Sequence, residues 1–171
     1  APTSSTTVAL ALGDALALCV LDQRDFTAED FARSHPGGSL GRRLLIHVND
    51  LMRTGHDIPQ VSADASLSQG LLEMTRKGLG LTAIVDANNI PIGIFTDGDL
   101  RRAFEQHVNV TTSSIKDVMH KNPLTIHQDK LAIEAVEMME LHKINALLVT
   151  NDSGTLVGAL NMHDLLLAKV V

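Results

Sequence analysis

Tryptophan and tyrosine are absent from the 171-residue sequence, and phenylalanine occurs only four times. Single-stranded nucleic acids bind proteins largely by stacking on aromatic side chains, so this kind of partner is not expected. Basic residues are also few, since 14 Lys and Arg stand against 20 Asp and Glu and give a formal net charge of −6. No basic stripe stands out, which argues against nucleic acid and against an anionic membrane as partners.

Cysteine and long apolar runs are scarce as well. Cys19 is the single cysteine, so an internal disulfide is excluded and a reducing, cytoplasmic compartment is expected. Asp14 interrupts the longest apolar run, residues 8–20, which is too short to span a bilayer and has no basic leader. Neither a membrane helix nor a signal peptide is therefore indicated. The chain starts with Ala-Pro rather than Met, which suggests a fragment or a processed product.

What the sequence does contain is a repeat with a period of 65 residues. Residues 93–100 form an apolar run that leads into a helix start, and residues 158–165 follow the same plan. Hairpin-like apolar runs precede both stretches, and Leu67, Leu71 and Met74 mark one face of a helix further upstream. Their counterparts 65 residues later are Ala132, Val136 and Met139. Each copy reads strand, helix, strand, strand, helix and is too small to close a core alone, so the two copies should pack face to face.

This order resembles a pair of cystathionine-β-synthase (CBS) domains. The resemblance rests on an apolar-Met entry, a hairpin and Gly-x-x-Thr-x-x-Asp, and it covers about residues 46 to 171. It implies an α/β (α+β) fold, a tandem CBS pair of two βαββα-type units with pseudo-two-fold symmetry. We expect the first CBS domain at residues 46–110 and the second at residues 111–171.

The first 45 residues have no repeat partner and predict helices without strands, so they are not expected to form a domain alone. Thr6 or Thr7 is expected to cap a helix that runs to about Gln23. Residues 27–30 resemble a capping box that starts a short second helix. A loop rich in glycine follows at residues 34–43, where the backbone can approach a ligand closely.

This segment resembles the C-terminal end of the sugar-isomerase (SIS) domain of D-arabinose 5-phosphate isomerases, in which a CBS pair follows directly. The matching stretches are residues 2–7, 13–17, 30–32 and His35-Pro36-Gly37-Gly38-x-Leu40-Gly41-Arg42. Residues 1–45 are thus expected to be a helical remnant of an SIS domain. The family converts ribulose 5-phosphate to arabinose 5-phosphate, an aldose–ketose isomerisation that feeds 3-deoxy-D-manno-octulosonate and lipopolysaccharide or capsule synthesis. Because most of the SIS domain would lie upstream, we expect the chain alone to be inactive.

The candidate catalytic residue is His35. Isomerisation needs an acid or base whose pKa lies near neutrality, and the resemblance places an active-site histidine at this position. A histidine that only orders the loop is the alternative. Ser4, Ser5 and Thr6 offer hydroxyls to the sugar or its phosphate, and Arg42 offers a guanidinium. Helix capping and surface solvation are the alternatives for these four residues.

In the CBS pair, the family pattern implies a site for an adenosine-type ligand. Thr96 and Asp99 stand where a strand meets a helix, so free N–H groups favour a phosphate and the aspartate can accept from ribose hydroxyls. Asn161 replaces the threonine in the second copy, which weakens the case for a phosphate there. Plain helix capping is the alternative. The expected nucleotide-binding residues are Gly80, Leu81, Thr96, Asp99, Asn145, Ala146 and Asp164.

The expected ligand is an effector, a nucleotide or a nucleotide-sugar such as a cytidine-linked sugar, and no cofactor is expected to be required. Asp97 and Asp99 favour few phosphates over a triphosphate. The eight histidines form neither a His-x-x-x-His pair nor a Cys/His cluster, so no metal site is expected. The expected partners are a second copy of the chain, in a dimer or tetramer, and a sugar phosphate bound through the missing SIS part.

Two other functions stay open at this point. One is a structural CBS pair that only mediates oligomerisation and binds no ligand. The other is a CBS module from an unrelated transporter or dehydrogenase, against which the His-Pro-Gly-Gly segment argues.

Overall fold

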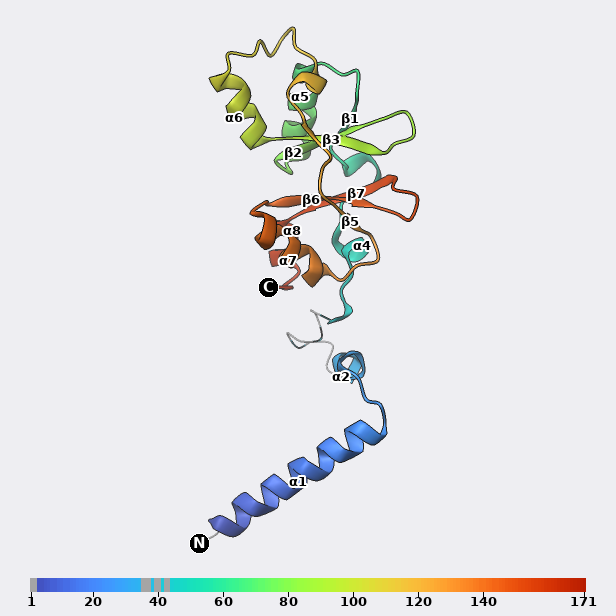
Figure 1. Cartoon of the computed structure of the whole chain (residues 1–171), viewed down its shortest axis with the longest axis vertical. Helices are drawn as coiled ribbons and strands as arrows, with labels where there is room; N and C mark the ends of the chain where they lie inside the picture. The colour runs from blue at the N-terminus through green and yellow to red at the C-terminus, as the bar shows by residue number, and fades with distance from the viewer. Residues whose placement is uncertain (1–2, 35–37, 39–40, 42–43) are drawn as a thin grey trace. The chain divides into compact units, whose positions relative to one another are not determined.

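The computed structural model describes residues 3–34, 38, 41 and 44–171 (Figure 1). The chain divides into two compact units, Ala1–Leu45 and Ile46–Val171. Each unit has its own local structure, and each is considered by itself below.

The first unit contains α1 (Ser4–Gln23) and α2 (Ala28–Ser34). Thr27 N donates to Asp30 Oδ2 at 3.0 Å and Asp30 N donates to Thr27 Oγ1 at 3.2 Å, which confirms the predicted capping box. The prediction that Thr6 or Thr7 caps α1 is wrong. The helix already begins at Ser4, and the Thr7 hydroxyl donates to the carbonyl of Thr3 at 3.3 Å instead.

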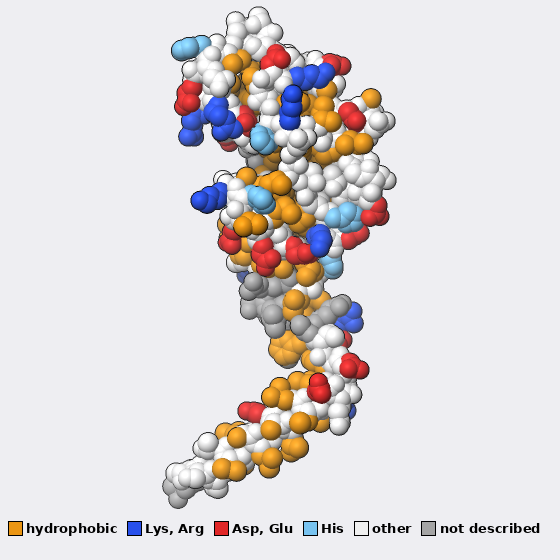
Figure 2. Space-filling model, in the orientation of Figure 1, with side chains coloured by type: hydrophobic (Ala, Val, Ile, Leu, Met, Phe, Trp, Pro, Cys, Tyr) orange, Lys and Arg blue, Asp and Glu red, His pale blue; other side chains and the backbone are white. Residues whose placement is uncertain are grey.

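The side chains of α1 are exposed along the whole helix. Leu10 is 65% exposed and Leu18 65% exposed, and hydrophobic side chains line the visible face of the helix (Figure 2). By length and composition alone α1 could cross a membrane, but a core helix of a globular protein meets the same criterion. This is weak evidence, so the absence of a membrane helix stays a prediction.

The second unit contains two copies of one supersecondary pattern, as the repeat predicts. The first copy consists of β1 (Gln60–Ser62), α5 (Leu67–Lys77), β2 (Leu81–Val85), β3 (Pro91–Thr96) and α6 (Asp97–Glu105). The second consists of β5 (Thr125–His127), α7 (Ala132–His142), β6 (Ala146–Thr150), β7 (Leu156–Asn161) and α8 (Met162–Leu167). Shorter elements are α4 (Val48–Leu51), η1 (Gly55–Asp57), η2 (Ile115–Asp117) and β4 (His120–Lys121). The predicted order is confirmed in both copies.

The strands form a sheet of order β1-β2-β3-β4 and a sheet of order β5-β6-β7. In each sheet the first pair is parallel and the next is an antiparallel hairpin. The two sheets face each other and the helices cover their outer sides (Figure 1). Leu81 and Ala83 of the first copy share a buried cluster with Leu148 and Ala159 of the second, which confirms that the copies pack face to face.

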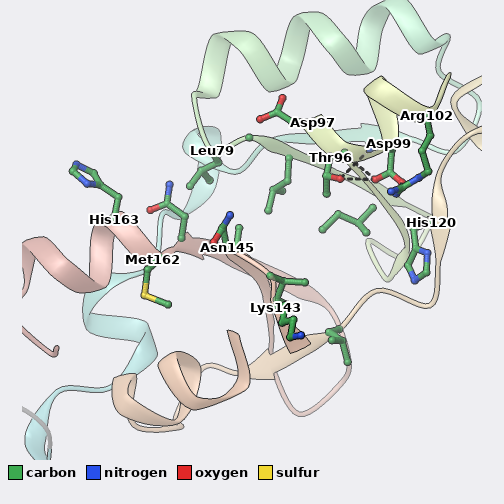
Figure 3. Close-up of a pocket in the computed structure, with 18 residues that line it drawn as sticks. Leu79, Thr96, Asp97, Asp99, Arg102, His120, Lys143, Asn145, Met162 and His163 are labelled. Atoms are coloured by element: carbon green, nitrogen blue, oxygen red, sulfur yellow. Dashed lines mark hydrogen bonds and ion pairs between the residues drawn. The ribbon is translucent and has the colours of Figure 1, made fainter. Parts of the chain in front are cut away.

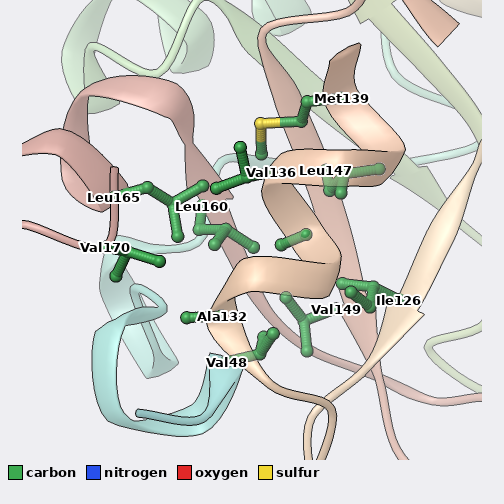
Figure 4. Close-up of a cluster of buried hydrophobic side chains, with 11 residues drawn as sticks. Val48, Ile126, Ala132, Val136, Met139, Leu147, Val149, Leu160, Leu165 and Val170 are labelled. Atoms are coloured by element: carbon green, nitrogen blue, oxygen red, sulfur yellow. The ribbon is translucent and has the colours of Figure 1, made fainter. Parts of the chain in front are cut away.

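Each copy completes its core with the segment that precedes the other copy. Val48 of α4 is fully buried among the side chains of α7, β6 and β7 (Figure 4). Ile115 is fully buried in the core of the first copy, where Met119 also packs. The cores therefore interlock, because residues that enter one copy along the chain stabilise the other.

Two glycines allow these entering segments to approach the sheets closely. A Cβ atom on Gly93 would lie 2.3 Å from the sulfur of Met119. A Cβ atom on Gly158 would lie 2.4 Å from the sulfur of Met52 and 3.0 Å from the carbonyl oxygen of Arg53. The two contacts with sulfur are shorter than real Cβ atoms show, so a side chain at either glycine would have to displace the methionine that faces it.

Candidate functional site

A cavity of about 640 Å³ lies between the two copies of the second unit (Figure 3). Its volume is within the range of small-molecule sites. The first copy contributes the start of β2, the end of β3 and the first turn of α6. The second contributes the residues from α7 to β6 and the first turn of α8, while His120 and Leu124 come from the connection between the copies.

The cavity brings together most of the residues predicted to bind a nucleotide. These are Gly80, Leu81, Thr96, Asp99, Asn145 and Ala146. Asp164 is not among the residues that line the cavity and forms an ion pair with Arg53 instead. The binding roles themselves stay predictions, but residues 65 apart in the sequence do meet in one hollow.

Thr96 caps α6 and orients Asp99. The Thr96 hydroxyl donates to Asp99 Oδ2 at 2.6 Å, and the backbone N–H of Asp99 donates to the Thr96 oxygen at 3.3 Å. Asp99 is only 7% exposed, and its Oδ1 accepts from the guanidinium of Arg102 (Figure 3). Oδ2 also accepts from Thr96 N at 2.9 Å, so both of its lone pairs are used, and Oδ1 keeps one lone pair for a ligand hydroxyl. Capping and ligand contact are therefore compatible at this corner.

The second copy repeats the cap with a different side chain. Asn161 Oδ1 accepts from the backbone N–H of Asp164 at 2.9 Å, and Asp164 Oδ2 accepts from the N–H of Asn161 at 3.3 Å. Leu167 stands 65 residues after Arg102, so α8 has no cation of its own at that place. Arg53 supplies one from another part of the chain, with Nη2 3.4 Å from Asp164 Oδ1.

Backbone bonds at the edge of the cavity are also repeated. Asp97 N donates to the carbonyl of Gly80 at 3.3 Å, and Met162 N donates to the carbonyl of Asn145 at 2.9 Å. Gly80 has φ +70°, and a Cβ atom on it would lie 3.1 Å from Asp97 Oδ2. The glycine thus keeps the wall of the first copy free of a side chain that would crowd that carboxylate.

Charges of both signs line the cavity. Asp97 and Asp99 are negatively charged, Arg102 and Lys143 are positively charged, and His120 lines the same cavity (Figure 3). The two negative and two positive charges balance. Arg102 already pairs with Asp99. A ligand with one or two phosphates suits this balance better than a triphosphate.

Sequence reasoning did not select Lys143, His120 or Arg53. Lys143 ends α7 with φ 54° at the place where Gly78 ends α5 with φ 65°. A comparison of the two copies at a spacing of 65 residues exposes that replacement. His120 and Arg53 carry no comparable signal, because only the fold brings the entering segments to the opposite copy.

The other predicted residues lie outside this cavity. Ser4, Ser5 and Thr6 are exposed in the first turns of α1, in the first unit. His35 and Arg42 lie outside the described residues, so their predicted roles stay predictions. Over the part of the chain that the structure describes, no three His, Cys, Asp or Glu side chains are grouped to hold a metal ion.

Comparison with known sequences places these features in a family. A family model for the CBS domain matches residues 48–106 and 115–170. The whole chain is 55% identical to arabinose 5-phosphate isomerase KdsD of Pseudomonas aeruginosa and 54% identical to that of Escherichia coli. The match covers 52% of each relative, so the chain spans about half the length of the curated relatives it matches. The predicted resemblance to this isomerase is confirmed.

Solved structures agree on the fold. CBSX2 in complex with AMP superposes with a TM-score of 0.63 at 22% identity, covering 72% of this chain and 95% of that one. The CBS domain protein PAE2072 from Pyrobaculum aerophilum, complexed with AMP, gives a TM-score of 0.64 at 23% identity over 70% of this chain and 90% of that one. These likenesses confirm the predicted tandem pair. Because the family model matches both repeats, the chain belongs to the CBS domain family.

Proposed function

We propose that the chain is the C-terminal regulatory part of an arabinose 5-phosphate isomerase and that its CBS pair binds a nucleotide or nucleotide-sugar. Identity of 55% over the whole chain supports the first part of the proposal. It also argues strongly against a module of an unrelated transporter or dehydrogenase. The single observation that carries the second part is the cavity between the copies, in which Thr96 and Asp99 meet Asn145 and Ala146.

Three features support an adenosine-type ligand. The first turn of α6 lines the cavity, so the positive end of the helix dipole lies beside it, as in phosphate sites. Oδ1 of Asp99 keeps one lone pair for a ribose hydroxyl beside that helix start. CBSX2 and PAE2072 hold AMP, and the CBS pair of MJ0100 holds 5′-methylthioadenosine and S-adenosyl-L-methionine. AMP is therefore the first ligand to test.

Residues 1–45 complete the proposal as the end of an SIS domain, with His35 as the catalytic group and Ser4, Ser5, Thr6 and Arg42 at the sugar phosphate. The exposed leucines of α1 support this, because such a face is normally covered by the rest of a domain. The full enzyme would convert ribulose 5-phosphate to arabinose 5-phosphate in the cytoplasm, as a homo-oligomer. The 171-residue chain alone would show no isomerase activity.

Thermal unfolding with AMP, ATP and cytidine nucleotides tests the regulatory proposal. A ligand at 100 times its dissociation constant adds about 2.7 kcal/mol of stability. For a chain of this size that shift is about 5–10 °C in Tm. We expect AMP and a cytidine nucleotide-sugar to raise the Tm more than ATP does. A flat response to all of them would favour the alternative of a CBS pair that serves oligomerisation only.

A further inference from the structure

We propose that Arg53 closes the second of the two pseudo-symmetric ligand corners, so that the pair takes one nucleotide per chain rather than two. The inference rests on the proposed nucleotide function of the cavity. We define the Asp99 corner as Thr96, Asp99, Arg102 and His120, and the Asp164 corner as Asn161, Asp164, Leu167 and Arg53. The cavity reaches Asp99 but not Asp164.

The backbone of Arg53 is held firmly against the second sheet. Arg53 N donates to the carbonyl of Ala159 at 2.8 Å, and Ala159 N donates back to the carbonyl of Arg53 at 3.2 Å. The preceding residue, Met52, lies over Gly158, which has no side chain to push it away. The position of the arginine is thus fixed by the fold rather than by its side chain alone.

The guanidinium joins the two copies. Nη1 donates to the carbonyl of Lys77, the last residue of α5, at 2.8 Å, and Nη2 lies 3.4 Å from Asp164 Oδ1. A cation is favourable at the C-terminus of a helix, and the arginine fork can reach two acceptors at once. To reach Asp164, a ribose would have to displace the guanidinium of Arg53 from the carbonyl of Lys77 and from Asp164 Oδ1.

The Asp99 corner also has an ion pair, between Asp99 and Arg102, but that pair does not bridge the two copies. There the cation is Arg102, which lies on the same helix as Asp99 and stays beside it. The place of Arg53 is taken by His120, since His120 pairs with Ile94 just as Arg53 pairs with Ala159, 65 residues later. His120 lines the open cavity and leaves room for a ligand. The two corners share a backbone plan, but at the second an arginine bridges the two copies.

Calorimetric titration of the 171-residue chain with AMP tests this difference. We expect about one AMP per chain in the wild type and about two per chain in Arg53→Ser, because the serine leaves Asp164 free. Arg101→Ser, which removes an exposed arginine of α6, serves as the matched control and keeps the wild-type stoichiometry. Should Arg53→Ser fail to melt cooperatively, Arg53→Met replaces it, since methionine keeps the apolar stem without the guanidinium.

The outcomes separate the two proposals. Two AMP molecules per wild-type chain would overturn the closure by Arg53 and leave the nucleotide function standing. One AMP per chain in a folded Arg53 variant would also overturn it. No binding by any of the proteins would overturn this inference together with the proposed function.

Discussion

Thr96 has two roles that point mutations can separate, the cap of α6 and a wall of the cavity. Replacement by alanine removes the acceptor for Asp99 N and should lower the free energy of unfolding by about 1 kcal/mol. Thr96→Asn should stay close to the wild type, because Asn161 already caps α8 with the same geometry. Urea unfolding followed by circular dichroism measures both. An asparagine variant as unstable as the alanine variant would contradict the role of the cap.

Lys143 holds a backbone conformation that costs energy for a residue with a side chain. Its φ of 54° lies in the left-handed region, which Gly78 occupies at the same place in the first copy. Lys143 also lines the cavity, where its ammonium group can attract a phosphate. We expect Lys143→Gly to raise the free energy of unfolding by about 0.5–1 kcal/mol and to weaken AMP binding several-fold.

Lys143→Asn is the matched control for this prediction. Asparagine tolerates the left-handed region but carries no charge, so it should weaken AMP binding as the glycine variant does. Titration calorimetry gives the affinity and urea unfolding gives the stability. Unchanged AMP affinity in both variants would exclude the ammonium group from the site.

At the scale of elements, the entering segments hold the two copies together. Gly158 on β7 lets Met52 and Arg53 approach the sheet, so a methyl group there must displace the segment. We expect Gly158→Ala to cost about 1–3 kcal/mol, the usual penalty of overpacking. The double variant Gly158→Ala with Met52→Ala should cost less than the two single changes added together. Strict additivity in urea unfolding would show that the two residues do not share the contact.

The start of α7 gives a prediction about pH. Glu134 Oε1 accepts from Lys130 Nζ and Oε2 from Leu131 N, both at 2.8 Å. The bond with Lys130 is the main reason that the pKa of Glu134 lies below its usual value of 4.5. A carboxylate with a lowered pKa stabilises the fold above the unfolded value, and this contribution is lost as the pH falls through the folded value.

Glu134→Gln should therefore lower stability near pH 7 by a few tenths of a kcal/mol, since the pair is partly exposed. The difference from the wild type should vanish once the pH falls below the folded pKa of Glu134, where both side chains are uncharged. Glu137→Gln, an exposed change on the same helix, is the control. A deficit of Glu134→Gln that persists unchanged at low pH would contradict the electrostatic origin.

At the scale of the whole molecule, the second unit contains both copies of the repeat and its own buried clusters. Removal of residues 1–45 should leave its unfolding midpoint in urea unchanged. The same deletion should reduce the binding of the dye ANS, because the exposed leucines of α1 are removed. A lower midpoint for the shortened chain would show that the first unit stabilises the second.

Much of this architecture follows from local patterns that the sequence displays directly. Leu67 and Ala132 begin corresponding helices because their spacing to Met74 and Met139 is helical in both copies. The interlocking of the cores could not be predicted in this way. It depends on contacts such as that of Val48 with the far copy, which local periodicity does not encode.

The candidate site, too, was predictable from the sequence only in part. A cap motif at a strand end identifies Thr96 and Asp99 in the sequence, and the fold places them in the cavity. Arg53 is placed beside Asp164 by its pairing with Ala159, and His120 is placed at the cavity by its pairing with Ile94. No sequence motif identifies either residue, because both pair with the opposite copy. The role of Asp164 was predicted from symmetry with Asp99, but Asp164 pairs with Arg53, which also bonds to the other copy, and Asp99 pairs with Arg102 of its own helix.

The most direct test of the central claim is a crystal structure of the chain soaked with AMP. The account predicts AMP in the cavity between the copies, with a ribose hydroxyl on Asp99 Oδ1 and its phosphate at the first turn of α6. An empty cavity in crystals soaked at millimolar AMP, or AMP bound elsewhere on the chain, would contradict it.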